Sequence, residues 1–125
     1  MLHAIRNVDY VILLCQDLGR MREFYHQTLG FPIYRTLGGW VELRVGAVLL
    51  TLRERGRAYD GVKAGDHACV QLAFRVTPAQ VDSCHTELLA RQVDILEPPK
   101  NSPSGHRTVF FKDPEGNVLE IYADL

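Results

Sequence analysis

Cysteine, tryptophan and methionine are all scarce in this chain of 125 residues, which carries three, one and two of them respectively. The cysteines, Cys15, Cys69 and Cys84, are odd in number and show no Cys-x-x-Cys spacing. This pattern is typical of free thiols in a reducing compartment, so it predicts a cytoplasmic protein without a disulfide framework. The length is enough for one ordinary domain and too short for two independent ones.

An excess of one charge and long hydrophobic runs are also missing. The 14 basic and 15 acidic residues give a net charge of -1, and no basic stripe is present, which argues against a nucleic-acid partner. The longest apolar run, Tyr10–Cys15, is far too short to span a bilayer, and Met1–Asn7 does not resemble a signal peptide. We therefore expect no membrane partner. The 46% hydrophobic and 23% charged residues are typical of a chain with a packed core.

The first half of the chain predicts a strand, a helix, a second strand and a hairpin. The helix is expected between an N-cap at Asp17 and a terminating Gly30, because apolar residues recur there at three- and four-residue spacings. The expected strands are Val8–Cys15, Phe31–Thr36, Trp40–Val45 and Ala47–Arg53.

The second half repeats this order. Thr77, Pro78 and Gln80 predict a helix start with a capping box. The expected strands are Val70–Val76, Val93–Leu96, Thr108–Lys112 and Val118–Ala123, with a longer loop at Pro98–Gly105. The sequence therefore predicts an α+β chain of two similar halves, joined by a polar linker at Glu54–Asp66.

Alternation along the hairpin strands predicts which side chains leave the core. Successive residues of a strand point to opposite faces, so an apolar set packing under the helices leaves a second set on the other face. The predicted core set is Val41, Leu43, Val45, Leu119 and Ile121. The opposite set is Trp40, Glu42, Arg44, Thr108, Phe110, Lys112, Val118, Glu120 and Tyr122. Aromatic side chains with a few polar groups are typical of small-ligand clefts, and we expect Glu120 to point into one.

Several segments carry a family resemblance that covers nearly the whole chain. They are Asp9-Tyr10-Val11, residues 24–31, residues 71–76, Gly105-His106-Arg107 and residues 111–121. Together they resemble the vicinal oxygen chelate superfamily, which includes glyoxalase I, extradiol dioxygenases, fosfomycin-resistance transferases and bleomycin-resistance proteins. The resemblance implies two βαβββ modules, near residues 4–53 and 67–125 with a linker at 54–66, whose mixed sheets form cups with the helices outside. It also implies a homodimer.

The resemblance places the family's metal ligands at Tyr10, Leu50, Gln71 and Glu120, with Tyr10 matched to Gln71 and Leu50 matched to Glu120 through the glycines of the two hairpins. Glu120 is a good ligand and Gln71 offers a neutral oxygen. Tyr10 would have to lose a proton whose pKa is near 10, and Leu50 cannot bind a metal. His67 would lie roughly 13 Å from Gln71 along a straight strand. We therefore favour a cleft without a cofactor, the alternative being zinc, nickel, manganese or iron on Gln71 and Glu120.

Two functions follow from this pattern. The first is a bleomycin-resistance-like protein that binds a small molecule without a metal. Its predicted ligand-binding residues are Tyr10, Trp40, Glu42, Arg44, His67, Gln71, Phe110 and Tyr122. The alternative is a glyoxalase-like lyase or isomerase in which Glu120 is the catalytic base or a metal ligand. The missing histidine ligands disfavour a dioxygenase or a fosfomycin-type transferase.

Overall fold

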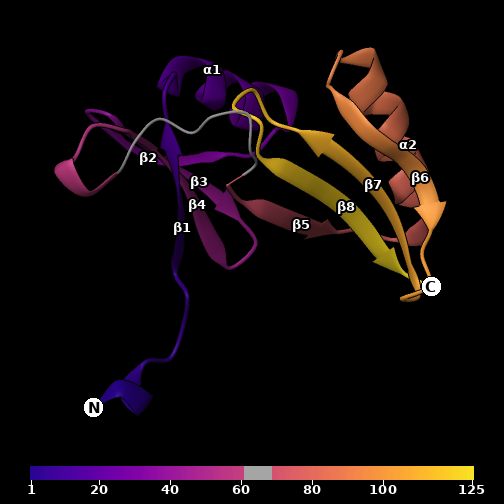
Figure 1. Ribbon diagram of the computed structural model, residues 1–125, viewed down its shortest axis with the longest axis horizontal. Helices are drawn as coiled ribbons and strands as arrows, with labels where there is room; N and C mark the ends of the chain where they lie inside the picture. The colour runs from indigo at the N-terminus through magenta and orange to yellow at the C-terminus, as the bar shows by residue number, and fades with distance from the viewer. Residues whose placement is uncertain (61–68) are drawn as a thin grey trace. The chain divides into compact units, whose positions relative to one another are not determined.

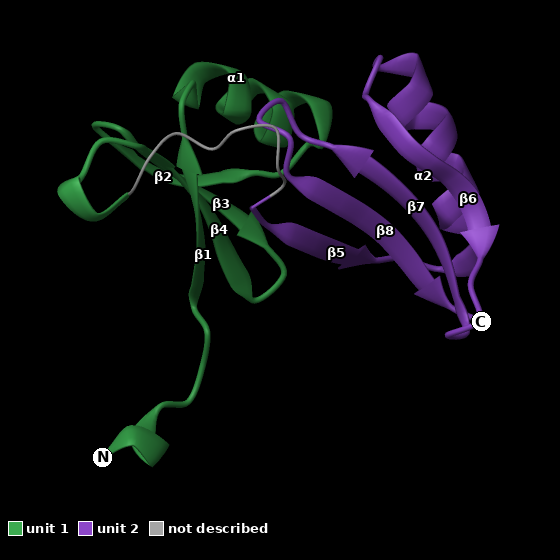
Figure 2. Ribbon diagram, viewed as in Figure 1, with its two compact units in different colours: residues 1–63 green, residues 64–125 purple. Residues whose placement is uncertain are grey.

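The computed structural model describes residues 1–60 and 69–125, and the predicted ligand-binding residue His67 lies outside these residues (Figure 1). The chain divides into two compact units, Met1–Lys63 and Ala64–Leu125 (Figure 2). Each unit holds a four-stranded mixed sheet with helices, which confirms the predicted α+β fold class. Of the helices formed by the described residues, none has the length and apolar character needed to cross a membrane.

Unit 1 builds its sheet in the order β1-β4-β3-β2, with β1 parallel to β4 and the other pairs antiparallel. Its strands are β1 (Tyr10–Cys15), β2 (Ile33–Leu37), β3 (Trp40–Val45) and β4 (Val48–Glu54). Its helices are η1 (Leu2–Ala4), α1 (Leu18–Arg22), η2 (Glu23–Thr28) and η3 (Ala58–Asp60).

Unit 2 repeats this topology in the order β5-β8-β7-β6, again with one parallel pair, β5 with β8. Its strands are β5 (Gln71–Arg75), β6 (Ile95–Asn101), β7 (His106–Lys112) and β8 (Val118–Asp124). Its helix α2 (Pro78–Ala90) starts at the predicted capping box, in which Thr77 and Gln80 satisfy each other's backbone N–H groups.

The core of each unit lies between its sheet and its helices. In unit 1 the fully buried side chains include Leu13, Met21, Tyr25, Leu43 and Leu52. In unit 2 they include Val81, Val109, Phe111, Leu119 and Ala123. The strand residues predicted to face the core are buried, apart from Val45, which is half-buried. The alternation argument therefore assigned the faces of these strands correctly.

The predicted first helix changes type along its length. Asp17 caps α1 by accepting from the Arg20 N–H at 3.1 Å, but from Glu23 the coil widens into the π-helix η2. The Leu29 N–H donates to the Phe24 carbonyl, five residues back, at 2.9 Å. Phe24 and Tyr25 both stay buried, so the wider turn keeps the predicted apolar face.

The predicted loop at Pro98–Gly105 is wrong for its first residues. Pro98 and Pro99 lie inside β6, the edge strand of unit 2. The ladder with β7 shifts register on either side of Glu97, which marks a bulge. Proline lacks the N–H that a central strand needs, and it is tolerated at edges and bulges. A composition rich in proline therefore hid a strand whose position in the sheet permits it.

The match of Leu50 to Glu120 is wrong by one residue. Tyr10 pairs with Leu49, whereas Gln71 pairs with Val118. The strand ladders therefore make Thr51 the counterpart of Glu120. Leu50 is a core residue, 3% exposed. The slip arises because the turn between β3 and β4 is shorter than residues 113–117 between β7 and β8, so aligning the glycines of the two turns misaligns the strands that follow.

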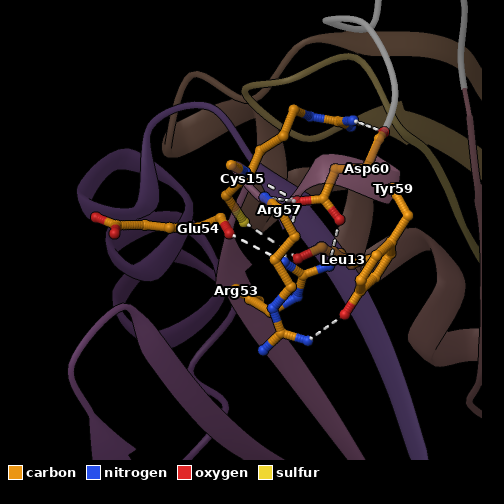
Figure 3. A network of polar contacts seen from close by, with 9 residues as sticks. Leu13, Cys15, Arg53, Glu54, Arg57, Tyr59 and Asp60 are labelled. Carbon is orange, nitrogen blue, oxygen red and sulfur yellow. Dashed lines mark hydrogen bonds and ion pairs between the residues drawn. The ribbon is translucent and has the colours of Figure 1, made fainter.

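The start of the predicted linker is fixed to unit 1 by Asp60 (Figure 3). Asp60 accepts from the Arg53 guanidinium at 2.7 and 3.0 Å and from the backbone N–H groups of Gly56 and Arg57 at 2.8 Å. The Arg53 hydrogen bonds, followed by those of the backbone, hold the pKa of Asp60 far below its usual range. Residues 55–60 therefore form a tight loop on the end of β4.

Candidate functional site

Each sheet has an open face, which we define as the face opposite the core between sheet and helices. The strand ladders place Trp40, Glu42, Arg44, Leu49, Thr51, Arg53 and alternate residues of β1 from Tyr10 on the open face of unit 1. They place Gln71, Arg75, His106, Thr108, Phe110, Lys112, Glu120, Tyr122 and Asp124 on the open face of unit 2. All predicted site residues within the described part of the chain lie on these two faces.

Glu42 is the buried carboxylate of the unit 1 face, and its charge is balanced within the unit. Its side chain is 0% exposed. The Arg35 guanidinium donates to both carboxylate oxygens, at 3.1 and 3.0 Å, and the Trp40 indole N–H donates at 2.9 Å. The Arg35 hydrogen bonds hold the pKa of Glu42 below its usual value, although burial alone would raise it.

Two further predicted residues border this cluster. The Tyr10 ring lies 6.3 Å from the Trp40 ring, and its hydroxyl adds to the lowering of the Glu42 pKa. The Arg44 guanidinium lies over the Tyr34 ring, 4.4 Å from its centroid. The polar groups of the unit 1 face thus largely bind one another.

Glu120 lies in the middle of the unit 2 face in a different setting. It is half-buried and stands directly opposite Phe110 across the β7–β8 ladder. The Gln71 amide N–H donates to Glu120 Oε1 at 3.3 Å. Among the described residues no Lys, Arg or His forms a salt bridge with Glu120. On this face an aromatic ring therefore lies beside a carboxylate that has no salt-bridge partner among the described residues.

The other two carboxylates on the described part of the unit 2 face are paired. Glu97, opposite Phe110 in the β6–β7 ladder, forms a salt bridge with Lys100 at 3.1 Å. Asp124 forms an ion pair with Arg75, and its Oδ1 lies 3.2 Å from His106 Nε2. The Tyr122 ring joins these groups, with the His106 ring centroid at 4.9 Å and the Arg75 guanidinium at 5.2 Å. Arg75 is thus engaged at the Asp124 end of the face. Glu120 is the open-face carboxylate that forms no salt bridge among the described residues, although Lys112 lies diagonal to it in the β7–β8 ladder.

The sequence match agrees with this repeated architecture. The profile of the Glyoxalase/Bleomycin resistance protein/Dioxygenase superfamily matches residues 7–121. The chain belongs to this superfamily.

Two curated relatives are similar to the chain in sequence, and a solved structure shares its fold. The virulence protein STM3117 of Salmonella typhimurium is 24% identical over 130 residues, covering 94% of this chain and 83% of the relative. The metallothiol transferase FosB of Shouchella clausii is 23% identical over 128 residues, covering 94% of this chain and 80% of FosB. A glyoxalase/bleomycin resistance protein/dioxygenase from Nocardioides superposes with a TM-score of 0.86 at 23% identity, covering 97% of this chain and 85% of that structure.

Members of this superfamily often bind a divalent metal, so the donor set of each face decides what this chain can hold. Within the part of the chain that the structure describes, no group of three or more His, Cys, Asp or Glu side chains is placed to hold a metal ion. Gln71 and Glu120 supply one amide and one carboxylate, and the amide N–H is turned towards the carboxylate. Thr51, the counterpart of Glu120, hydrogen-bonds to the Leu49 carbonyl. These donors do not fit a divalent-metal site on either face.

Sequence reasoning missed three residues that shape the faces. Arg35 was not connected to Glu42, because β2 joins β3 through an irregular register between Ile33 and Arg35. His106 precedes the predicted strand Thr108–Lys112, but it lies in β7 beside Asp124. Asp124 is the third residue, and it lies at the end of β8, one residue beyond the predicted strand. Extending the alternation of the two predicted strands would have placed His106 and Asp124 on the open face.

Proposed function

We propose that this superfamily member binds a small, flat cation on the open face of unit 2, without a metal, and that Glu120 is the residue that recognises the charge. The observation that carries the proposal is that the half-buried Glu120 carboxylate opposite Phe110 forms no salt bridge among the described residues. The other open-face carboxylates among the described residues are Glu42, Asp124 and Glu97, and they already have Arg35, Arg75 and Lys100 as partners.

The physical reason is the partial burial of Glu120 opposite Phe110. A hydrogen bond to a charged group contributes about 1.5–3 kcal/mol, and the contribution grows where solvent is partly excluded. A planar cation would satisfy the carboxylate while its ring packs on Phe110 and Tyr122, which add apolar area and cation–π attraction. Gln71 donates to one oxygen of Glu120, which leaves the other oxygen for the ligand.

Benzamidinium is a suitable probe, because it combines a flat ring with a delocalised cation. We expect it to bind in titration calorimetry, and we expect uncharged benzamide and anionic benzoate to bind at least tenfold more weakly. Glu120→Gln should abolish this preference. Glu87→Gln is the matched control, because it removes an exposed carboxylate from the outer helix α2. Equal binding of all three probes to the wild type would contradict the proposal.

The absence of a metal is tested separately. Protein purified without chelator should contain well below one equivalent of zinc, nickel, manganese or iron by elemental analysis. A stoichiometric ion that survives gel filtration would contradict the metal-free part of the proposal. If Glu120→Gln also removed that ion, Glu120 would be its ligand.

A second candidate function is proton transfer by a glyoxalase-like lyase or isomerase. The arrangement that favours it is the Gln71–Glu120 pair, in which a carboxylate without a cationic partner is held by an amide and can accept a proton from a carbon next to a carbonyl. Solvent deuterium incorporation into the hemithioacetal of methylglyoxal and glutathione, or into its 2-hydroxy thioester isomer, would detect this step by NMR. Exchange lost in Glu120→Gln and kept in Glu87→Gln supports the enzyme, and no exchange above the protein-free rate contradicts it.

A further inference from the structure

Thr108 is a buried open-face residue with a polar atom that no described residue satisfies. Its residue exposure is 4%, and its Oγ1 has no hydrogen-bond partner among the described residues. A buried hydroxyl without a partner is rare and costs free energy in the folded protein. We propose that the Thr108 hydroxyl is a specificity-determining contact of the ligand bound at Glu120, and that this ligand carries a second hydrogen-bonding group for it. This inference rests on the proposed function and names a further feature of the ligand.

The position of Thr108 in the sheet fits this role. It lies opposite Tyr122 in the β7–β8 ladder, and the next open-face pair is Phe110 with Glu120. Thr108 and Glu120 are therefore diagonal neighbours on one face, and such residues are about 7–8 Å apart. A single substituted aromatic ring spans a separation of this size, so one flat ligand can contact the carboxylate and the hydroxyl together.

The internal repeat explains why the hydroxyl is left over. The ladders make Trp40 the unit 1 counterpart of Thr108, because Trp40 pairs with Arg53 as Thr108 pairs with Tyr122. The Trp40 N–H is satisfied by Glu42, two residues along the same strand. In unit 2 the corresponding residue is Phe110, which has no acceptor. The polar partner present within unit 1 is thus missing within unit 2, where a ligand can supply it.

The unpartnered Thr108 hydroxyl leads to a prediction about the stability of the ligand-free protein. Thr108→Val keeps the shape of the side chain and removes the hydroxyl, so the melting temperature of the ligand-free variant should equal or exceed that of the wild type. A hydroxyl that is bonded inside the free protein would give the opposite result. Thr108→Ser is the matched variant, because it keeps the hydroxyl and loses only a methyl group.

Binding is tested with benzamidine and its 3-hydroxy and 4-hydroxy derivatives. We expect at least one hydroxy derivative to bind the wild type about tenfold more tightly than benzamidine does. Thr108→Val should lose this preference, while Thr108→Ser should keep it. This pattern assigns the lost affinity to one hydroxyl on the ligand and one on the protein.

Each contrary outcome has a separate meaning. If benzamidine binds but neither hydroxy derivative is preferred, or if Thr108→Val keeps the preference, the role of Thr108 is overturned and the proposed function stands. If none of the probes binds the wild type, the proposed function and this inference both fail. A lower melting temperature of ligand-free Thr108→Val, with that of Thr108→Ser unchanged, would overturn the inference as well, because the hydroxyl would then have a partner without the ligand.

Discussion

Glu42 and Glu120 show how one scaffold gives two carboxylates different surroundings. Glu42 is enclosed and saturated by Arg35 and Trp40, so its charge stabilises the fold of unit 1. Glu120 has the Gln71 amide as its hydrogen-bond partner within the described part of unit 2, so no described salt bridge offsets its charge. The difference arises from single residues. Arg35 on β2 forms a salt bridge with Glu42, and no described cation forms one with Glu120.

The Arg35–Glu42 pair leads to a prediction about acid stability. The pKa of Glu42 is lowered in the folded protein, so its stabilising contribution is present above the unfolded pKa of about 4.3 and is lost as the pH falls through the folded pKa. Arg35→Met removes the partner and leaves burial to raise the pKa instead. We expect a lower melting temperature for Arg35→Met at pH 7, and a difference from the wild type that shrinks between pH 7 and pH 4.

Thermal melts followed by circular dichroism across this pH range measure the effect. Arg91→Met is the control, because Arg91 forms an exposed pair with Glu87 on the surface of α2, and it should lower the melting temperature much less. A gap between the wild type and Arg35→Met that widens on acidification would show that Arg35 does not hold Glu42 ionised.

At the scale of elements, the capping box of α2 gives a prediction with a magnitude. Thr77 is the N-cap. Its side chain accepts from the Gln80 backbone N–H, and the Gln80 side chain accepts from the Thr77 backbone N–H. Thr77→Ala should lower the free energy of unfolding by about 1 kcal/mol. Thr86→Ala makes the same chemical change at an exposed interior position of α2, where alanine favours the helix by a few tenths of a kcal/mol. Urea denaturation separates the two variants, and equal losses would contradict the capping role.

The elements also show what sequence can and cannot establish. Alternating polarity placed Val41, Leu43 and Leu119 in the core correctly, because a half-buried strand allows one such arrangement. It failed for β6, where Pro98 and Pro99 are tolerated by an edge that local composition does not identify. It also failed to match Thr51 with Glu120, because the register of a ladder depends on turn length as well as on the glycine within the turn.

The candidate site was predictable to a similar depth. The sequence indicated that Gln71, Phe110, Glu120 and Tyr122 share one face, and the ladders place them there. The partners of the charges were not predictable, because a cation such as Arg35 reaches its carboxylate through an irregular strand pairing. The orphan hydroxyl of Thr108 follows from what its neighbours lack, and an absence of partners is visible only in three dimensions.

At the scale of the whole molecule, the chain repeats one module and specialises the copies. Both units have the same strand order and one parallel pair. Unit 1 largely satisfies its open-face polar groups internally, whereas unit 2 retains the Glu120 carboxylate and the Thr108 hydroxyl. A repeat of this kind allows one copy to keep a stable sheet while the other carries groups whose burial costs stability until a ligand binds.

Assembly gives the last prediction, a homodimer. Within its own unit, each of β1 and β5 is an edge strand of the sheet, and such edges favour pairing with another chain unless they are protected. Tyr10 and Ile12 on β1 are 41% and 42% exposed, although both are large and apolar.

Light scattering after gel filtration should therefore give the mass of two chains of 14.2 kDa. Ile12→Lys should shift the protein towards monomer, while Leu89→Lys, which replaces an exposed leucine on α2, should not. A monomeric wild type at micromolar concentration would contradict the assembly, and equal effects of both lysines would place the interface away from β1.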